Sequence, residues 1–255
     1  MFTRRLVFKT GILFLFAFSV NHSYAQSDWK WPEKPQNLQV LPKDWTGKRL
    51  SPVMKGFTRA LGVRCVYCHV GEEGKPLSTY DFVSDSNPNK DRAREMYRML
   101  GDINDHLKKI KPSGDKPVNM WCNTCHNGKP RPMTLPEELE EKYRAKGIDE
   151  ALTHYSNLKK KFYAKSSYDF TEESLNDFAY DLLEKKDMTG AIKVFQLNTQ
   201  EFPDSPNVWD GLAEGYMKSG DMKLAERYYQ KVLTMVPGNK HAVEMLKKVK
   251  ESAGK

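Results

Sequence analysis

The stretches GVRCVYCHVG, residues 62–71, and NMWCNTCHNG, residues 119–128, contain all four cysteines of this 255-residue chain. In each stretch a Cys-x-x-Cys pair is followed directly by His. This is the attachment pattern of c-type haem, in which both thiols bond to the haem and the His ligates its iron. We therefore predict two covalently attached haem c groups. The residues that hold them are predicted to be Cys65, Cys68 and His69 for the first, and Cys122, Cys125 and His126 for the second.

Other uses of the four thiols explain the pattern less well. Cysteines of exported proteins usually form disulfides, and zinc sites use paired Cys-x-x-Cys motifs roughly 15–20 residues apart. Cys68 and Cys122 are 54 positions apart, and neither a disulfide nor zinc accounts for the His after each pair. A thioredoxin-like redox pair lies in a βαβ unit, and no such pattern surrounds either motif.

The segment that ends at Ala25 has the order of a secretory signal peptide. Basic residues precede an apolar run at 11–20, and small residues follow it up to Ala25. The run is about half of the roughly 20 residues that span a bilayer, which favours a cleaved signal over an uncleaved anchor. We predict cleavage near Ala25, export to the periplasm and no membrane span in the mature chain. An exported chain is not expected to bind nucleic acid.

A helix that carries Met is predicted before the first motif. The sequence SPVMKGFTRALGV, residues 51–63, begins with Ser51 as N-cap and Pro52 at the first helical position, and Gly62 is its stop signal. Met54 lies on the apolar face of this helix. Met on such a face usually fills a core, so periodicity alone leaves its role open.

A second helix with Met is predicted before the second motif, over residues 86–110. It begins at Asn87, followed by Pro88, and carries Met96 on its apolar face with Met99 rotated off that face. His106 lies further along the same helix. From the residues alone, any of these three side chains is a candidate distal ligand of the second haem iron.

These segments resemble the haem-binding segments of the cytochrome subunit of photosynthetic reaction centres. The resemblance rests on Met54 eleven positions before Cys65 in LGVRCVYCHVG, and on DFVSDSNPNKDRAREMYRMLGDIN followed by WCNTCHNGKPRP. It covers residues 45–133. In that family each haem segment is a helix, a turn and a second helix that begins with the attachment motif, and a Met of the first helix is the sixth iron ligand of most haems. The resemblance implies that Met54 ligates the first iron and Met96 the second.

Two departures from the family pattern matter. Its best-known member carries four haems, whereas this chain has motifs for two. The interval between Met96 and His126 is also longer, which leaves Met99 and His106 open as alternatives.

The resemblance implies an exported electron carrier that passes single electrons between redox partner proteins. His/Met ligation raises the reduction potential and leaves no open iron position if both haems have it. The alternative is an enzyme, a peroxidase-like dihaem oxidoreductase with one open haem.

The sequence after Pro136 changes to charged amphipathic helices with an internal repeat. Its period matches the roughly 34 residues of tetratricopeptide (TPR) units, in which paired helices meet at small residues. The recurring pairs are Ala179 and Ala213, Ala191 and Ala225, Phe195 and Tyr229, and Pro203 and Pro237. Such a stack presents a surface for a protein partner, or it supports the haem part structurally.

The predicted fold is all-α. We expect helices and long loops around the haems, because the cofactors themselves form much of that core, and TPR-like helical hairpins after them. The predicted segments are a signal peptide at 1–25, a dihaem cytochrome c domain at 26–135, a helical connector at 136–170, and TPR-like repeats with a capping helix at 171–255.

Overall fold

The computed structural model describes residues 29–110 and 118–253, so the predicted signal peptide lies outside the described residues. Within these ranges the regular secondary structure is helical, and long loops join the first helices; one isolated antiparallel bridge links Val70 and Asp81. The predicted all-α class is confirmed. The helices in chain order are α1 (Gly47–Leu61), η1 (Cys65–Tyr67), η2 (Leu77–Thr79), α2 (Pro88–Leu107), α3 (Cys122–His126), α4 (Leu135–Lys146), α5 (Ile148–Phe162), α6 (Glu172–Glu184), α7 (Met188–Glu201), α8 (Pro206–Ser219), α9 (Met222–Met235) and α10 (Lys240–Ala253).

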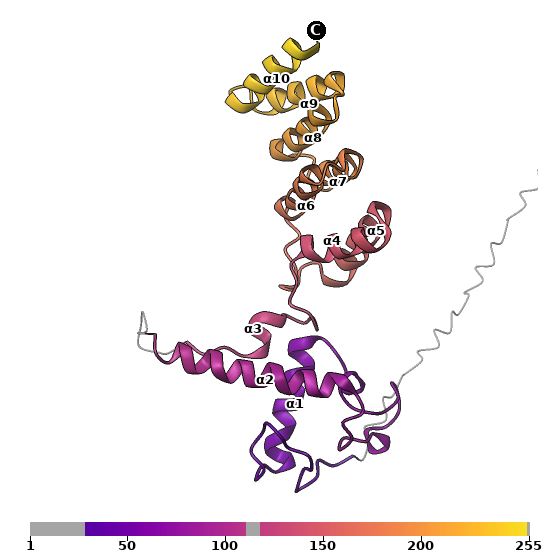
Figure 1. The fold of residues 1–255 in the computed structure, drawn as a ribbon, viewed down its shortest axis with the longest axis vertical. Coiled ribbons are helices and arrows are strands. Elements are labelled where there is room, and N and C mark those ends of the chain that lie inside the picture. Colours follow the sequence, from indigo (N-terminus) through magenta and orange to yellow (C-terminus); the bar gives the residue numbers. More distant parts are fainter. Residues whose placement is uncertain (1–28, 111–117, 254–255) are drawn as a thin grey trace, which may run out of the picture.

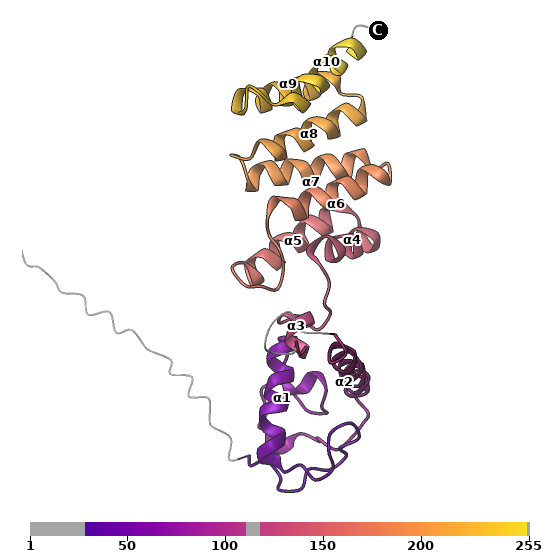
Figure 2. The same ribbon diagram turned by 90° about the vertical axis from the view of Figure 1, so that its left-hand side faces the viewer.

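The described residues form an elongated molecule (Figure 1). Helices α1, α2 and α3 lie together at one end, and α4 to α10 stack in successive layers toward the C-terminus (Figure 2). None of the helices in the described ranges has the length and apolar character needed to cross a membrane.

Helix α1 begins one turn earlier than predicted. Its N-cap is Thr46 rather than Ser51, and Pro52 lies inside the helix. The amide of Gly47 donates a hydrogen bond of 3.0 Å to the carbonyl oxygen of Pro32. This contact with an earlier segment of the chain stabilises the added turn, and a local capping signal cannot reveal it.

The other predicted boundaries of the two Met-bearing helices follow local signals. Gly62 ends α1 in the left-handed conformation with φ of 64°. Asn87 caps α2, because its side-chain oxygen accepts a hydrogen bond of 3.1 Å from the amide of Asn89. Helix α2 ends at Leu107, slightly before the predicted end at residue 110.

The predicted repeat is confirmed by two helical hairpins. Helices α6 and α7 begin at Glu172 and Met188, and α8 and α9 begin one repeat later, at Pro206 and Met222. Small and aromatic residues at equivalent positions are fully buried where the helices meet. These residues are Ala179, Ala191, Ala213, Ala225, Phe195 and Tyr229.

The hydrophobic core lies almost wholly in the helical stack. Helices α4 and α5 share one cluster with α6 and α7, and α10 packs on α9 in a second. In the described residues up to 134, the buried hydrophobic side chains are Leu41, Leu50 and Ala60. Because a segment of this length needs a core to fold, the part around the two motifs requires something else to fill its interior.

Candidate functional site

The first motif lines a cavity of about 480 Å³. The walls come from the segment 29–41, α1, η1, α2 and the loop 77–83. Cofactor sites typically have volumes of roughly 300–1,000 Å³. The structure brings the four predicted residues of the first haem site to this one cavity. They are Met54, Cys65, Cys68 and His69.

His69 is suited to bind a metal ion at neutral pH. Burial lowers its pKa to about 4, with further lowering by the positive charges of Lys90 and Arg94. The imidazole is therefore neutral and has a free lone pair. Its ring packs edge-on against Phe82 at 4.9 Å between centroids. The Nδ1 atom of His69 is buried and has no hydrogen-bond partner among the described residues.

All four cysteines lie in the described part of the chain, and none of them forms a disulfide there. Burial raises the pKa of Cys68, and Cys65 raises it further. Burial also raises the pKa of Cys122. Among the described residues, no three His, Cys, Asp or Glu side chains gather into a metal-binding cluster.

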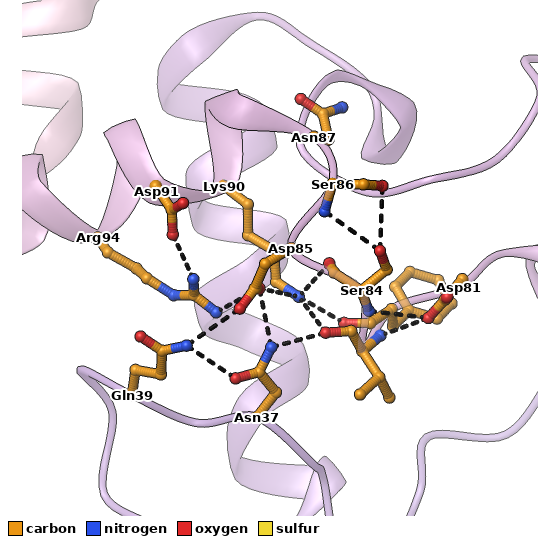
Figure 3. Close-up of polar contacts among 12 residues, drawn as sticks. Asn37, Gln39, Asp81, Ser84, Asp85, Ser86, Asn87, Lys90, Asp91 and Arg94 are labelled. Carbon is orange, nitrogen blue, oxygen red and sulfur yellow. Dashed lines mark hydrogen bonds and ion pairs between the residues drawn. The ribbon is translucent and has the colours of Figure 1, made fainter.

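A polar network contributes Asn37, Lys90 and Arg94 to the wall of the first cavity, and its contacts are drawn in Figure 3. Asp85 accepts hydrogen bonds of 2.8 Å from both Asn37 Nδ2 and an Arg94 guanidinium nitrogen. Lys90 Nζ donates to the carbonyl oxygens of residues 82–84 at 2.8–3.0 Å. Arg94 is only 7% exposed. The network ties the N-terminal segment and the loop before α2 to the first turns of that helix.

The charges in this network reinforce each other. The Arg94 guanidinium, together with Asn37, holds the pKa of Asp85 well below its usual range. Asp85 in turn raises the pKa of Arg94. Sequence reasoning missed these residues. The only local signal is that Lys90 and Arg94 are four positions apart on a helix, and so share a face.

The second motif forms α3, which is held by α1 and α2. Trp121, the N-cap of α3, stacks on Phe57 with centroids 5.7 Å apart and meets Tyr97 edge-on at 6.4 Å. The Asn104 side chain exchanges two hydrogen bonds with the backbone of Met120, at 3.0 and 2.8 Å. These contacts fix the attachment motif against both Met-bearing helices, and sequence analysis did not identify them.

His126 is buried, and a hydrogen bond fixes its tautomer. Its Nδ1 lies 2.9 Å from the carbonyl oxygen of Lys129. A carbonyl can only accept, so Nδ1 carries the proton and Nε2 keeps a free lone pair. Met96 and Met99 are 40% and 45% exposed on α2, and His106 is exposed as well. The distal ligand of the second motif therefore stays a prediction.

The two motifs meet through the backbone. The amide of Gly128, just after the second motif, donates a hydrogen bond of 2.8 Å to the carbonyl oxygen of Ala60, at the end of α1. A Cβ atom on Gly62 would lie 2.1 Å from the carbonyl oxygen of Gly128. The residues that flank the two motifs thus belong to one packed unit.

Comparison with known protein families gives a match to the photosynthetic reaction centre cytochrome c subunit over residues 20–196, more than half of the chain. The chain belongs to this family. The resemblance inferred from the sequence is confirmed, and family membership implies covalently attached haem c. The cavity fits such a group, because it brings two thiols and a neutral imidazole together in a part of the chain that has almost no core of its own.

Individual known proteins match shorter parts of this chain. Cytochrome c-554 of Chloroflexus aurantiacus is 32% identical over 94 residues, which are 37% of this chain and 20% of that protein. The chain therefore matches about a fifth of the length of this relative. The first TPR domain of human RPAP3 has a TM-score of 0.35 and 16% identity, covering 47% of this chain and 90% of that one. The TPR2AB domain of yeast Sti1 has a TM-score of 0.33 and 21% identity, covering 47% and 46%.

Proposed function

We propose that this chain is an exported dihaem c-type cytochrome that passes single electrons between redox partner proteins. The observation that carries the proposal is the first cavity, in which a Met, a His and two thiols of one attachment motif line the same space. The first haem is held by Cys65, Cys68, His69 and Met54. The second is held by Cys122, Cys125, His126 and Met96.

The chain's residues have distinct roles at the first site. A bound haem c supplies a one-electron iron couple, and His/Met ligation gives it a higher potential than two His ligands do. Cys65 and Cys68 anchor the group covalently, and His69 offers a neutral nitrogen. Met54 would supply a sulfur ligand to the iron, and no open iron site would then be left for a substrate. This favours electron transfer over catalysis.

Two observations support a second haem at α3. His126 is buried in the tautomer that leaves Nε2 free to bind iron. Large apolar side chains near the motif are also exposed, among them Met96, Met99 and Trp121. A haem placed between α2 and α3 would cover such side chains and provide the missing core.

The domain division is part of the proposal. We place the dihaem domain at 26–135, the connector at 136–170 and the TPR-like repeats at 171–255. The main hydrophobic cluster begins at Leu135 and contains α4 and α5 as well as the repeats, which supports a boundary before α4. The repeats project away from the haem part (Figure 1), and we propose that they dock a protein partner.

The test is an optical study of the purified full-length protein. We expect two haems per chain by pyridine haemochrome, low-spin spectra in both oxidation states, and the near-infrared band of Met bound to ferric iron at two-haem intensity. Carbon monoxide should leave the reduced spectrum unchanged. A carbon monoxide shift would mean an open iron and would favour the dihaem oxidoreductase. Mass spectrometry of the exported protein should find the mature chain starting after Ala25.

A further inference from the structure

The helical stack contacts the residues just after the second attachment motif. The loop between α5 and α6 contributes two of these contacts. Ser167 Oγ donates a hydrogen bond of 2.6 Å to the carbonyl oxygen of Asn127. The ammonium group of Lys129 lies over the ring of Tyr168, 3.8 Å from its centroid. Both contacts fall close in sequence to the predicted iron ligand His126.

Lys129 is held firmly between the two parts of the chain. It is only 7% exposed, although a lysine side chain is rarely buried. Its Nζ also donates a hydrogen bond to the carbonyl oxygen of Met133. The ammonium thus has the aromatic face on one side and a backbone acceptor on another, so the position of the residue depends on the ring of Tyr168.

Tyr168 in turn is fixed by the helical stack. Its hydroxyl donates a hydrogen bond of 3.1 Å to Glu138 on α4. Its ring packs edge-on against Phe162 and Phe170, at 5.3 and 6.0 Å. The ring that faces Lys129 is therefore part of the aromatic packing of the helical stack.

The backbone of Lys129 provides the hydrogen-bond acceptor for His126. Nδ1 of His126 donates to this carbonyl at 2.9 Å. Such a partner orients a metal-binding imidazole and makes it a stronger donor to the metal. A stronger donor stabilises ferric iron and lowers the reduction potential. Nδ1 of His69 has no such partner among the described residues.

We propose that Ser167 and Tyr168 are positioning residues for the second haem. Through Asn127 and Lys129 they hold the carbonyl acceptor against His126, and so the helical stack sets the potential of that haem. The inference rests on the proposed function, because it requires a haem at the second motif. The inference goes beyond the proposed function, because it gives the helical stack a direct effect on the redox site.

The test is a spectroelectrochemical titration of full-length variants. Tyr168→Leu removes the ring from Lys129, and Tyr168→Phe keeps the ring as a matched control. In Tyr168→Leu we expect the reduction equilibrium constant of the second haem to rise about tenfold, which is about 59 mV for one electron. Tyr168→Phe should leave both steps unchanged. The step that Met54→His lowers is assigned to the first haem.

Ser167→Ala is a second, milder variant, and it should raise the same step. If Tyr168→Leu does not retain two haems, Ser167→Ala decides the question. An unchanged second step in a variant with two haems per chain overturns the inference, and so does an equal shift of both steps. Fewer than two haems in the unmodified protein would instead overturn the proposed function itself, which separates the two failures.

Discussion

Gly128 and Ala60 are joined by a backbone hydrogen bond of 2.8 Å, in which the amide of Gly128 donates to the carbonyl of Ala60. The bond links the residue two positions after His126 with the end of the helix that carries Met54. In a part of the chain with so few buried hydrophobic residues, such direct contacts fix the distance between the two attachment sites.

Replacing Gly62 should test how closely the end of α1 must approach the backbone of Gly128. In Gly62→Ala the new Cβ would lie 2.1 Å from the carbonyl oxygen of Gly128, at a residue with φ of 64°. We expect a loss of about 2–4 kcal/mol in the free energy of unfolding, from backbone strain and the clash together. Denaturant unfolding followed by haem absorption measures it.

Gly74→Ala is the matched control. Gly74 also has a positive φ, of 84°, but nothing lies within 4 Å of its Cβ position. The backbone strain alone should cost about 1 kcal/mol. Equal losses in the two variants would mean that the approach of Gly62 to Gly128 does not matter.

The distal ligand of the second haem can be identified by comparing two neighbouring methionines. Met96→Ala should halve the intensity of the near-infrared band and allow carbon monoxide to bind to one of the two reduced haems. Met99→Ala should leave the spectrum unchanged, although the two side chains are almost equally exposed on the same helix. The reverse result would assign the role to Met99, and no change in either variant would favour His106.

The first haem should have the higher reduction potential. The Nδ1 atom of His126 donates to the Lys129 carbonyl, whereas that of His69 has no partner among the described residues. His69 is therefore the weaker electron donor to iron. Redox titration of the unmodified protein and Met54→His tests this expectation. The expectation is contradicted if Met54→His shifts the redox step that has the lower potential in the unmodified protein.

The network around Asp85 should make the first haem site sensitive to acid. Its folded-state pKa is depressed, so it contributes stability above the usual Asp pKa of about 3.9 and loses it as the pH falls through the lower folded value. The thermal unfolding temperature, followed by the absorbance of the first haem, should therefore differ most between the unmodified protein and Asp85→Asn near neutral pH. The difference should shrink below about pH 4.

Asp105→Asn provides a control for this pH effect. Asp105 pairs with Lys108, at 2.7 Å, and both side chains are well exposed. Exposed pairs contribute little to stability, so this variant should unfold like the unmodified protein at every pH. A difference for Asp85→Asn that is the same in acid and at neutral pH would show that its charge is not the cause.

A fragment of residues 26–135 should still bind two haems, because every proposed ligand lies within it. It lacks Ser167 and Tyr168, so the second haem should have a raised potential while the first keeps its own. Pyridine haemochrome and a redox titration of the fragment test this. Recovery of apoprotein alone would show that the dihaem domain does not fold independently.

Local signals in the sequence were enough to predict much of this fold. Asn87 caps α2, Gly62 ends α1, and the internal repeat places small and aromatic side chains where helices meet. Each of these features depends on residues close together in the chain, or on a regular period. That Met54 and the motif at Cys65 line one cavity was also predictable, because only the rest of α1 and a short turn separate them.

Contacts between distant segments could not be predicted. The first turn of α1 contacts a carbonyl of Pro32, and the buried Arg94 pairs with Asp85, which also accepts a hydrogen bond from Asn37. In the sequence Lys129 looks like an ordinary surface lysine. In the structure it lies against Tyr168, which follows α4 and α5 in the chain. Charged residues of this kind are identified only when the tertiary structure brings their partners together.

The backbone hydrogen bond between Gly128 and Ala60 also has a consequence for protein design. Its two atoms belong to the main chain, so exchanges of side chains that leave Gly62 and Gly128 in place remove neither of them. The motifs themselves are not separable, because Gly62, just before the first, lies against the backbone of Gly128, just after the second. A designer who moves either motif onto a new scaffold must therefore carry residues 60–69 and 122–129 together, as a single discontinuous module.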